Sequence, residues 1–505
     1  MTRPPAPLTR RTCRARRRTR TALALPLALC VGVAAVACSD PPTSGGDDVQ
    51  AGGDGGTELP DCPIEALDEA DGPVEVTLWY GGIGGPVKQT LEDMVAGFNA
   101  SQDQVVVRAS DQGSSFAEVY RTLESAAAAN VDQLPDLVML ETNQLQSLAD
   151  SRLVLPAQAC MEADGYDLTD IEAAVRSAFS VGDVLYPGYV NVSSQVLYYN
   201  KAHWVKAGLD PDAPPQTLEE LHEQARALKD AGVSDKPLSF KISHAVFENW
   251  LSGDGIDVVN NGNGREGRAT EATFAVPEAE ETLATLRQMY DEGLVNVFAS
   301  VEGGIDHFLA LATQDSSMLI ETSTASSTIA QTLGGDLTPE EAGIDFDASV
   351  VEVTDLVPGT GPFPGLSSSG QVHPGDGEFF IVDTSPPAEQ AGAWKMLEFM
   401  LQPANAQAWH LSGGYLPIVK SVQDEPEVQA FWQDDLAGVL LKPAVDQLDD
   451  ADPDEPGPLI GPFPDFADEV EQAIEAVLLD NADPATALAD AQEAVTESLQ
   501  RYEGG

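Results

Sequence analysis

The side chains that could do catalytic chemistry are present in this sequence but are poorly spaced for it. The six His are scattered and form no H-E-x-x-H pair, the spacing that places two imidazoles on one helix face for zinc. Residues 262–267 read GNGREG and satisfy G-x-G-x-x-G, but no apolar-periodic helix follows to hold a phosphate at its N-terminus. Residues 365–370 read GLSSSG and miss the G-x-S-x-G nucleophile elbow by one position. Zinc, dinucleotide and serine catalysis are therefore poorly supported.

The acidic residues leave one catalytic alternative open. A glycosidase needs only two carboxylates that flank the scissile bond, and the 82 Asp and Glu of this chain could contain such a pair. Residues 449–455 are rich in acids but lack the spaced ligands of an EF-hand loop. We therefore expect no metal and no cofactor.

A second class of side chains is suited to noncovalent binding. Tyr415 follows Gly413-Gly414 and precedes Pro417, so its loop should expose the ring. Glu141 directly follows an apolar segment, where it could face a ligand or cap the next helix. Trp250 could stack on a ligand or pack in a core. Aromatic faces and fixed polar groups of this kind bind small polar molecules.

The elements that must position these residues alternate between strand and helix. Strands are expected at 74–80, 105–107 and 137–140, and helices at 87–99, 116–129 and 141–149. This order predicts a parallel α/β sheet with crossover helices. Ligands of such sheets bind at the carboxyl ends of the strands, where the loop 81–85, the turn 113–116 and Glu141 should meet.

A second α/β unit is expected after residue 190. Its helix at 217–231 has Thr217 as N-cap and Glu220 at the capping-box position. Further strands are expected at 196–200, 317–320 and 378–382, and further helices at 278–292, 387–401, 403–411, 465–479 and 484–502.

The composition excludes some classes of partner. The 505 residues carry 82 Asp and Glu against 26 Lys and Arg, a formal charge of −56. Nucleic-acid affinity comes largely from Lys and Arg, so DNA and RNA binding are not expected. Such an acidic surface is typical of strong solvation or salt tolerance, and binding of calcium or of a cationic partner is the less favoured interpretation.

The N-terminus has the pattern of an export signal. Eight Arg precede an apolar run from Ala22 to Ala37, which is too short to span a bilayer comfortably. Ala35-Val36-Ala37-Cys38 closes the run and predicts a lipoprotein signal at 1–37 with Cys38 as the lipidated residue. Plain secretion is the alternative, and the sequence does not decide between the general and the twin-arginine export routes. The Gly- and Asp-rich residues 38–61 should form a flexible tether.

Cysteine usage agrees with export. Cys62 and Cys160 are the remaining Cys of the folded body once the signal is removed and Cys38 is lipidated. One pair outside the cell predicts a disulfide, with two free buried thiols as the alternative. Two Cys without a neighbouring His cluster cannot complete a zinc site.

Two long segments resemble the family 1 extracellular solute-binding proteins of carbohydrate ABC transporters, nearest to their glycerol-3-phosphate-binding subgroup. They read VLYYNKAHWVKAGLDPDAPPQTLEEL (196–221) and PANAQAWHLSGGYLPIVKS (403–421). The resemblance implies a two-lobed α/β fold, each lobe a mostly parallel sheet flanked by helices, with a hinge that the chain crosses more than once. We place the first lobe at 74–190 plus 345–400 and the second at 191–344 plus 401–505.

The resemblance also implies where a ligand binds. Six residues match positions of the subgroup's cleft, and Trp250 is added as an aromatic that could stack from the second lobe. The residues matched by the resemblance are Phe116, Glu141, Ser193, Ser323, Gly375 and Tyr415.

One departure from the subgroup concerns phosphate. Leu459 stands where the subgroup has an arginine that grips phosphate, and a leucine cannot pair with a dianion. The expected function is therefore a monomeric, lipid-anchored receptor, not an enzyme, that captures a sugar or oligosaccharide and delivers it to an ABC permease with a cytoplasmic ATPase. Binding of glycerol-3-phosphate or a glycerophosphodiester is the first alternative, and a secreted carbohydrate-active hydrolase is the second.

Overall fold

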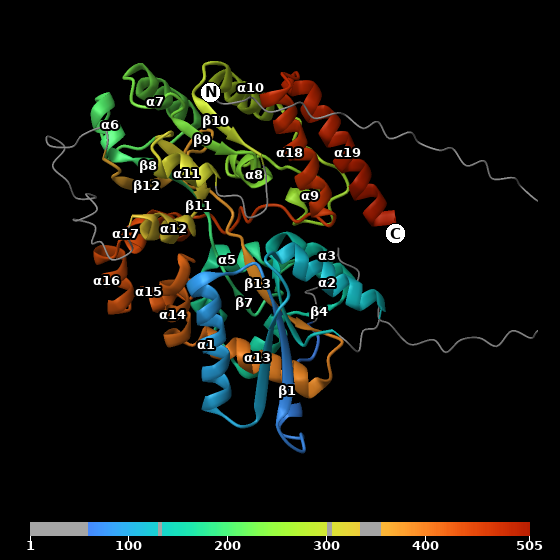
Figure 1. The fold of residues 1–505 in the computed structure, drawn as a ribbon. Helices are drawn as coiled ribbons and strands as arrows, with labels where there is room; N and C mark the ends of the chain where they lie inside the picture. Colours follow the sequence, from blue (N-terminus) through green and yellow to red (C-terminus); the bar gives the residue numbers. More distant parts are fainter. Residues whose placement is uncertain (1–58, 130–133, 300–305, 334–354, 505) are drawn as a thin grey trace, which may run out of the picture. The chain divides into compact units, whose positions relative to one another are not determined.

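The computed structural model describes residues 59–129, 134–299, 306–333 and 355–504. The predicted signal at 1–37, Cys38 and most of the tether at 38–61 lie outside these residues. Two sheets with helices packed against them make up most of the described chain (Figure 1). Strands β5 (Ser180–Val181) and β6 (Val184–Leu185) form a separate two-stranded ribbon.

The first sheet has the strand order β2-β1-β3-β13-β4, and β7 also pairs with β13. The strands β1 (Val74–Tyr80), β2 (Val105–Asp111) and β3 (Leu137–Glu141) are parallel to one another. Strand β13 (Gly377–Val382) runs antiparallel to β3, to β4 (Val154–Leu155) and to β7 (Tyr189–Val190).

Both faces of the first sheet are apolar, because alternate residues of its central strands point to opposite sides. Met139 and Phe379 pack in one core with residues of α1 (Gly85–Ser101) and α13 (Pro387–Leu401). Val138 and Phe380 pack in another with residues of α2 (Phe116–Ala129) and α3 (Leu145–Ser151). The strands are thus fixed between helical layers, and only their ends are left for a site.

Shorter elements complete this part of the molecule. Cys62, just before η1 (Ile64–Leu67), is joined by a disulfide to Cys160 in α4 (Ala157–Asp164), the pair expected from the sequence. The remaining elements are η3 (Thr142–Gln144), η4 (Leu168–Asp170) and α5 (Ala173–Ala178).

The second sheet has the strand order β10-β9-β11-β8-β12. Strand β9 (Leu238–Lys241) is parallel to β10 (Val295–Phe298) and to β11 (Met318–Thr322). Strand β8 (Gln195–Asn200) is antiparallel to β11 and to β12 (Pro358–Pro362). One face of this sheet packs in an apolar core with residues of α6 (Lys201–Ala207), α7 (Leu218–Asp230), α8 (His244–Ser252), α10 (Pro277–Asp291), α18 (Phe463–Leu479) and α19 (Pro484–Gly504). On the other face, Val196, Tyr198 and Leu319 pack in the core that holds Met139 and Phe379.

The other helices are short or lie late in the chain. They are α9 (Asn260–Asn263), α11 (Asp306–Ala312), α12 (Ala325–Thr332), α14 (Pro403–Gly413), α15 (Lys420–Gln423), α16 (Pro426–Asp434) and α17 (Leu436–Asp449).

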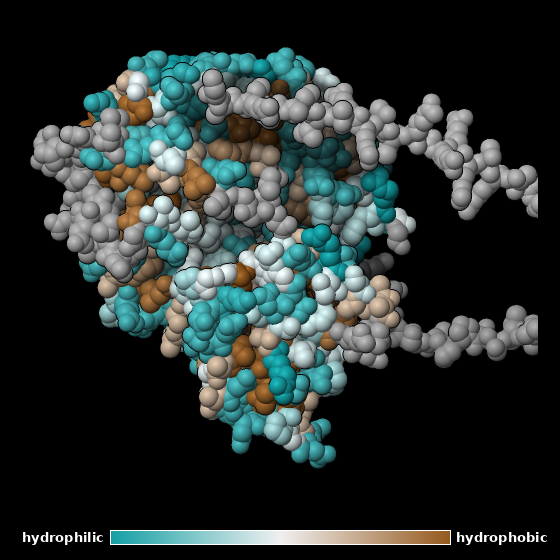
Figure 2. Space-filling view, in the orientation of Figure 1, coloured by the Kyte–Doolittle hydropathy of each residue, from teal (hydrophilic) through white to brown (hydrophobic). Residues whose placement is uncertain are grey.

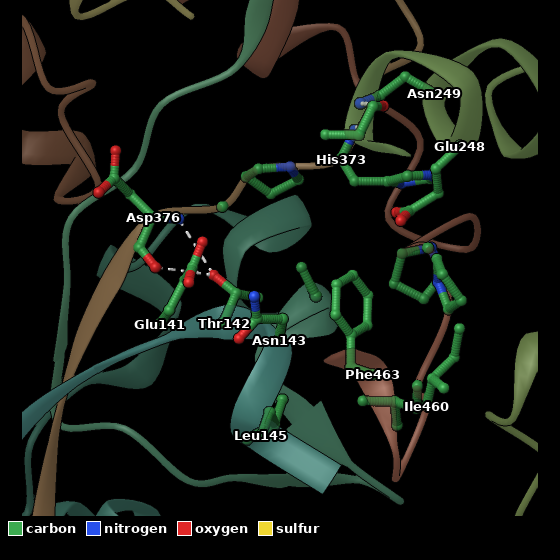
Figure 3. A pocket seen from close by; sticks show the side chains of 18 of the residues that line it. Glu141, Thr142, Asn143, Leu145, Glu248, Asn249, His373, Asp376, Ile460 and Phe463 are labelled. Carbon is green, nitrogen blue, oxygen red and sulfur yellow. Dashed lines mark hydrogen bonds between the residues drawn. The ribbon is translucent and has the colours of Figure 1, made fainter. Parts of the chain in front are cut away.

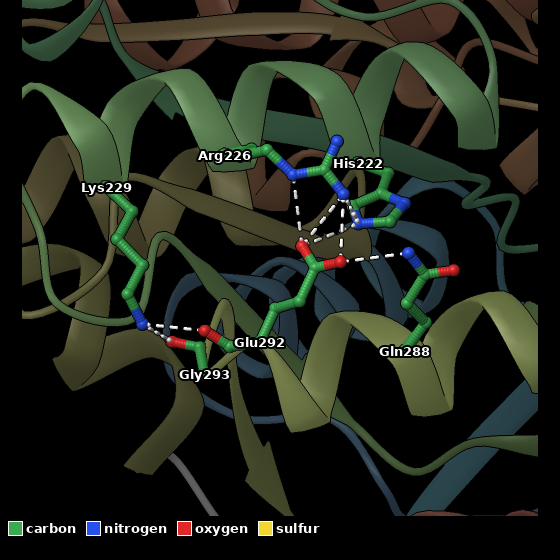
Figure 4. A network of polar contacts seen from close by, with 6 residues as sticks. All are labelled: His222, Arg226, Lys229, Gln288, Glu292 and Gly293. Carbon is green, nitrogen blue, oxygen red and sulfur yellow. Dashed lines mark hydrogen bonds and ion pairs between the residues drawn. The ribbon is translucent and has the colours of Figure 1, made fainter.

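A polar network ties α7 to the C-terminal end of α10 (Figure 4). Arg226 donates to both carboxylate oxygens of Glu292 at 2.9 Å, and Gln288 donates to the same carboxylate. Lys229 donates to the backbone oxygens of Glu292 and Gly293, which satisfies carbonyls that a helix end leaves open. These hydrogen bonds, that of Gln288 first, lower the pKa of Glu292 to about 2. The network holds α7 and α10 together at the surface, where the Arg226 side chain is 47% exposed.

The predicted elements agree well with the observed ones, and the strands expected at 74–80, 105–107 and 137–140 are parallel as predicted. The strand at 74–80 and the helices at 116–129 and 387–401 coincide with β1, α2 and α13. The sheets are mixed instead of mostly parallel, because β8 and β13 enter their sheets from extended segments and not through crossover helices.

The predicted lobe limits differ from the observed pairing in two places. The limits place residues 358–362 in the first lobe, but these residues form β12 in the second sheet. Their sequence PGTGP has no apolar alternation, so it gave no strand signal. The limits also place α14 in the second lobe, but the ring of its Trp409 packs against Tyr189 of β7 and Phe379 of β13 in the first sheet.

The described surface is largely hydrophilic on the face shown in Figure 2, with apolar residues in separate patches. This agrees with the acidic composition. Among the described residues, we find no helix long and apolar enough to cross a lipid bilayer.

Candidate binding site

A cavity of about 260 Å³ lies where segments from both sheets meet (Figure 3). Two crossing segments pass beside it: residues 191–194 lead from β7 to β8, and residues 363–376 lead from β12 to β13. Ser193 and Gly375 form an antiparallel bridge between these crossing segments. The cavity is lined by residues 141–143, 145 and 146 at the end of β3 and after it, and by 193–195 and 373–376. It is also lined by His244, Ala245, Glu248 and Asn249 of α8, by the loop 456–460, and by Ala178, Arg265, Thr322 and Phe463.

Glu141 stands at the end of β3, where the pairing with β13 sets it opposite Gly377. It forms a capping box with Gln144 at the start of η3, and it also lines the cavity. Glu141 therefore caps the next helix and also lines the cavity. The cap fixes the direction of the side chain toward the cavity (Figure 3).

Asp376 lies one residue before β13 and accepts two side-chain hydrogen bonds. The Ser193 hydroxyl donates to Oδ2 at 3.1 Å, and the Tyr415 hydroxyl donates to Oδ1 at 3.5 Å. Its backbone N–H donates to the Thr142 hydroxyl at 3.0 Å (Figure 3). Burial, followed by the charge of Glu141, raises the pKa of Asp376 to about 7. Asp376 is therefore only partly ionised at neutral pH.

A third acid, Glu378, is fully buried within β13. The Thr142 hydroxyl donates to its Oε1, while Oε2 has no hydrogen-bond partner in the described chain. Burial raises the pKa of Glu378 well above its ordinary value, and the charges of Asp376 and Glu141 act in the same direction. Glu378 does not line the cavity, and the acids that line this wall are Glu141 and Asp376.

The opposite wall carries another acid on α8. Burial raises the pKa of Glu248 to about 7, although the charges of His244 and Arg265 oppose the change. His244 Nδ1 lies 3.0 Å from Glu471 Oε1. Burial lowers the pKa of His244, but the hydrogen bond to Glu471 and the nearby carboxylates outweigh it, so the net pKa is raised. The His244 ring is thus already paired with Glu471.

Arg265 lines the cavity but uses its whole guanidinium elsewhere. Its Nε donates to the Gly457 oxygen at 2.7 Å, and its Nη1 donates to the oxygens of Ser177 and Ser180. Its Nη2 donates to the oxygens of Ala178 and Pro456, both at 3.1 Å. All five N–H groups are therefore bound to backbone carbonyls, and none is left to hold a ligand phosphate.

His373 contributes an imidazole without a protein partner. Both ring nitrogens are buried, and neither has a hydrogen-bond partner in the described residues. Its backbone N–H donates to Asn249 Oδ1 at 2.8 Å, which holds the residue against α8. Burial, and then the charge of Arg265, lowers the pKa of His373 to about 4. The ring is neutral at pH 7 and offers one donor and one acceptor.

The family follows from a profile comparison. The profile described as bacterial extracellular solute-binding protein matches residues 93–436, more than half of the chain. The chain belongs to the bacterial extracellular solute-binding proteins. The match spans the crossing segments and most of the cavity wall described above.

Named relatives of this solute-binding protein support the same family. It is 22% identical over 457 residues to the sn-glycerol-3-phosphate-binding periplasmic proteins UgpB of Shigella dysenteriae serotype 1 and Escherichia coli strain K12, covering 87% of this chain and 96% of each relative.

Solved structures show the same fold. The cyclic alpha-maltosyl-1,6-maltose binding protein of Arthrobacter globiformis has a TM-score of 0.67 at 23% identity, over 85% of this chain and 100% of that chain. The sugar-binding protein MalE of Xanthomonas citri has a TM-score of 0.68 at 18% identity, over 85% and 98%. UgpB of Mycobacterium tuberculosis, in complex with glycerophosphocholine, has a TM-score of 0.65 at 17% identity, over 86% and 99%.

Three of the seven predicted ligand residues line the cavity of this solute-binding protein: Glu141, Ser193 and Gly375. Tyr415 does not line it but donates to Asp376, and its ring stacks on Trp409. Tyr415 is only 7% exposed, so the expectation that its loop exposes the ring is wrong. The flanking glycines let the loop approach its neighbours, since a Cβ at Gly413 would overlap Val87.

The other three predicted residues do not line the cavity; Trp250 and Ser323 are buried, and Phe116 is partly buried. Trp250 is 1% exposed, donates to the Pro364 oxygen and packs on aromatic rings of the second core, so it is a core residue. Phe116 lies against the backbone of Gly377, where a Cβ would come within 2.5 Å of its ring. Ser323 is fully buried, and its hydroxyl accepts from the Ser194 N–H at 3.4 Å.

Sequence reasoning missed the residues that give the cavity its charge. Glu248 precedes Asn249 in α8, whose second half is entirely buried, and no sequence spacing indicates that Glu248 lines a cavity. Arg265 stands in the GNGREG segment, whose pattern points to phosphate, a role that its carbonyl contacts do not allow. Asp376 stands between two glycines just before a strand, and this is the one sequence feature that could have indicated a cavity residue. Leu459 does line the cavity, as its match to the subgroup's phosphate-binding position predicts.

Proposed function

We propose that this solute-binding protein is anchored by a lipid on Cys38 to the outer face of the cytoplasmic membrane, where it captures a small sugar and delivers it to an ABC permease. Membership in the family supports the receptor role, and the names of the related proteins support sugars or glycerophosphates as ligands. The ATPase that drives import would act from the cytoplasm, and the receptor would work as a monomer.

The choice of ligand depends on the charged groups around the cavity. Glu141, Asp376 and Glu248 present carboxyl groups, while the guanidinium of Arg265 is saturated by backbone carbonyls. A phosphate dianion placed there would meet acids and would have no free arginine to pair with. Leu459 adds an apolar surface at the position matched to a phosphate-binding arginine. We therefore favour a phosphate-free sugar over glycerol-3-phosphate or a glycerophosphodiester.

The size of the cavity narrows the ligand further. A volume of about 260 Å³ lies just below the ~300 to 1,000 Å³ typical of pockets for drug-sized ligands. A monosaccharide or disaccharide is a better match than a long oligosaccharide.

The crossing segments support a hinge mechanism. Two predicted lobes, each built on one sheet, would open to admit the sugar and close on it. The Ser193–Gly375 bridge joins the two crossing segments beside the cavity, so a small rotation there would move both cavity walls. The closed form would be the one that the permease recognises.

The decisive test is a thermal-shift and calorimetry screen of the purified full-length protein. The ligands are monosaccharides, disaccharides, glycerol-3-phosphate and glycerophosphocholine, each recovered and checked for chemical change. A phosphate-free sugar at 100 times its Kd should stabilise the native state by about 2.7 kcal/mol and return unmodified. Binding of the phosphorylated ligands alone would refute the choice of ligand, and turnover of any ligand would refute the receptor role.

The anchor has its own test. Cys38→Ser should release the protein from the membrane fraction into the medium, and mass spectrometry of the parent protein should find a lipid on Cys38. Retention of Cys38→Ser in the membrane fraction would contradict the lipoprotein interpretation.

A further inference from the structure

Three side chains in the cavity wall contain buried polar atoms without a protein partner. Both ring nitrogens of His373, Oδ1 of Asn143 and Oε1 of Gln195 have no hydrogen-bond partner among the described residues. All three residues line the cavity, and Figure 3 shows the side chains of His373 and Asn143. Buried polar atoms of native proteins nearly always have a partner, because an unpaired one is costly. These atoms therefore point to a bound molecule that supplies the missing hydrogen bonds.

His373 is held in place by two neighbouring segments. Its backbone N–H donates to Asn249 Oδ1 at 2.8 Å. Its ring lies against Gly457, where a Cβ would come within 2.6 Å of the imidazole Cγ. Burial lowers the pKa of His373 to about 4, so the ring is neutral at pH 7 and has one donor and one acceptor. The imidazole is thus preorganised, and both of its nitrogens are left for another molecule.

The two amides come from segments that belong to different sheets. Asn143 lies in η3, directly after β3 of the first sheet, and the capping box of Glu141 and Gln144 fixes this turn. Gln195 is the first residue of β8 in the second sheet, and its backbone oxygen accepts from the Gln447 side chain at 3.0 Å. The unpartnered atom of each amide is its oxygen, which only accepts. A ligand that bonds to both amides must span the cavity.

The number of unpaired groups limits the chemistry of the ligand. The imidazole needs one donor and one acceptor, and each amide oxygen needs one donor, so the ligand must bring at least three donors. A hydroxyl has one donor, whereas an ionised phosphate offers acceptors only. Glycerol-3-phosphate and glycerophosphocholine have two hydroxyls each and cannot pair all of these atoms. Sugars and sugar alcohols have enough hydroxyls.

We propose that His373, Asn143 and Gln195 determine specificity by binding hydroxyl groups of an uncharged sugar or sugar alcohol that has at least three free hydroxyls. This rests on the proposed sugar-receptor function and names the residues by which the receptor selects its ligand. The three residues lie in segments that the proposed hinge motion would move, so opening would let the ligand reach their polar atoms and closure would exclude water from the new bonds. A ligand that lacks one of these hydroxyls would leave a buried group unpaired and would bind more weakly.

The first variant separates a ligand-binding role from a structural one. His373→Phe keeps a flat ring and removes both nitrogens. Because these nitrogens have no partner in the ligand-free protein, the melting temperature without sugar should be unchanged or higher, whereas sugar affinity should fall tenfold or more. An affinity within about twofold of the parent protein would overturn the inference. A ligand-free variant that is clearly less stable than the parent would contradict the unpaired state of the nitrogens.

Calorimetry with matched sugars tests the hydroxyl contacts directly. The full-length protein would be titrated with glucose, galactose, mannose, maltose, glycerol-3-phosphate and glycerophosphocholine, and then with single-deoxy derivatives of the sugar that binds best. At least one deoxy position should cost tenfold or more in affinity for the parent protein and less than about threefold for His373→Phe, which lacks the partner of that hydroxyl. Equal losses in both proteins at every position would overturn the inference and leave the sugar receptor standing. No binding of any sugar would defeat both.

Three more variants complete the test. Asn143→Leu and Gln195→Met replace each amide with an apolar side chain of similar size, and each should weaken binding of the same sugar about tenfold. His222→Phe makes the same change as His373→Phe at a histidine of α7 that pairs with Glu292 and does not line the cavity, so it should leave the affinity unchanged. Unchanged affinity in both folded amide variants, or an equal loss in His222→Phe, would overturn the inference.

Discussion

Arg265→Lys tests the contribution of one side chain to stability, because this side chain holds together separate parts of the chain. Its guanidinium reaches the end of α5 with β5 through Ser177, Ala178 and Ser180, and the loop before α18 through Pro456 and Gly457. Lysine keeps the charge but has three donors on one nitrogen, so at least two of the five hydrogen bonds must be lost.

The expected loss follows from that difference. A hydrogen bond from a charged donor contributes about 1.5 to 3 kcal/mol, so losing two should reduce the free energy of unfolding by about 3 kcal/mol or more. Burial adds to the effect, because the carbonyls that lose their partner lie at a wall of the cavity, and burial already lowers the pKa of Arg265 to about 10.

The measurement is guanidinium chloride unfolding of the variant beside a matched control. Arg268→Lys changes an arginine three positions away, whose side chain is 44% exposed and pairs with Asp150 at the surface. The free energy of unfolding of that control should fall by less than about 1 kcal/mol. If the free energy of unfolding of Arg265→Lys lies within about 0.5 kcal/mol of the parent protein, or if both variants lose the same stability, Arg265 does not hold these segments together as proposed.

Three further predictions follow from buried groups. The free energy of unfolding should fall as the pH rises from about 4 to above 7, because Asp376 and Glu248, with pKa values of about 7, keep protons in the folded state that the unfolded state has released. Denaturant midpoints measured across this pH range should show the decrease in stability. The Asp376→Asn variant should show a smaller decrease. Replacing Cys62 and Cys160 with Ser should cost about 4 kcal/mol, since their bond closes a loop over a sequence separation of 98, and an unchanged melting temperature would contradict this. Trp250→Ala should cost about 3 to 5 kcal/mol by opening a cavity in the core, whereas a fully stable variant with lost sugar binding would return Trp250 to the binding site.

Local sequence was enough to predict most secondary structure. The N-cap Thr217 accepts from the Glu220 N–H at 3.2 Å as the capping-box pattern predicts, and Pro387 opens α13 where a proline is tolerated. These features depend on neighbours within a few residues, so the sequence shows them directly. The end of β3 at Glu141 belongs to the same class, because an apolar run that stops marks a strand end.

Strand pairing was less visible because partners are far apart in the chain. The segment PGTGP at 358–362 becomes a strand through its pairing with β8 and not through its own pattern. Similarly, neither β8 nor β13 carries a local sign of running antiparallel to its neighbours. Direction depends on where the chain arrives from, and the crossing segments decide that.

The binding site divides in the same way between sequence and structure. The sequence by itself determined the family resemblance, the disulfide pair, and the cavity residues Glu141, Ser193 and Gly375. It could not separate Trp250 from the core, because an aromatic residue on a buried helix has the same pattern as one that faces a ligand.

Only the tertiary structure decided the charge of the cavity. Asp376 lies more than 100 residues along the chain from both Glu248 and Arg265, and each of the three acquires its ionisation or its partners from groups that other segments bring to it. Burial and charge at a point are sums over everything nearby in space, whatever its place in the chain. A sequence shows which groups are available, and the fold decides which of them meet.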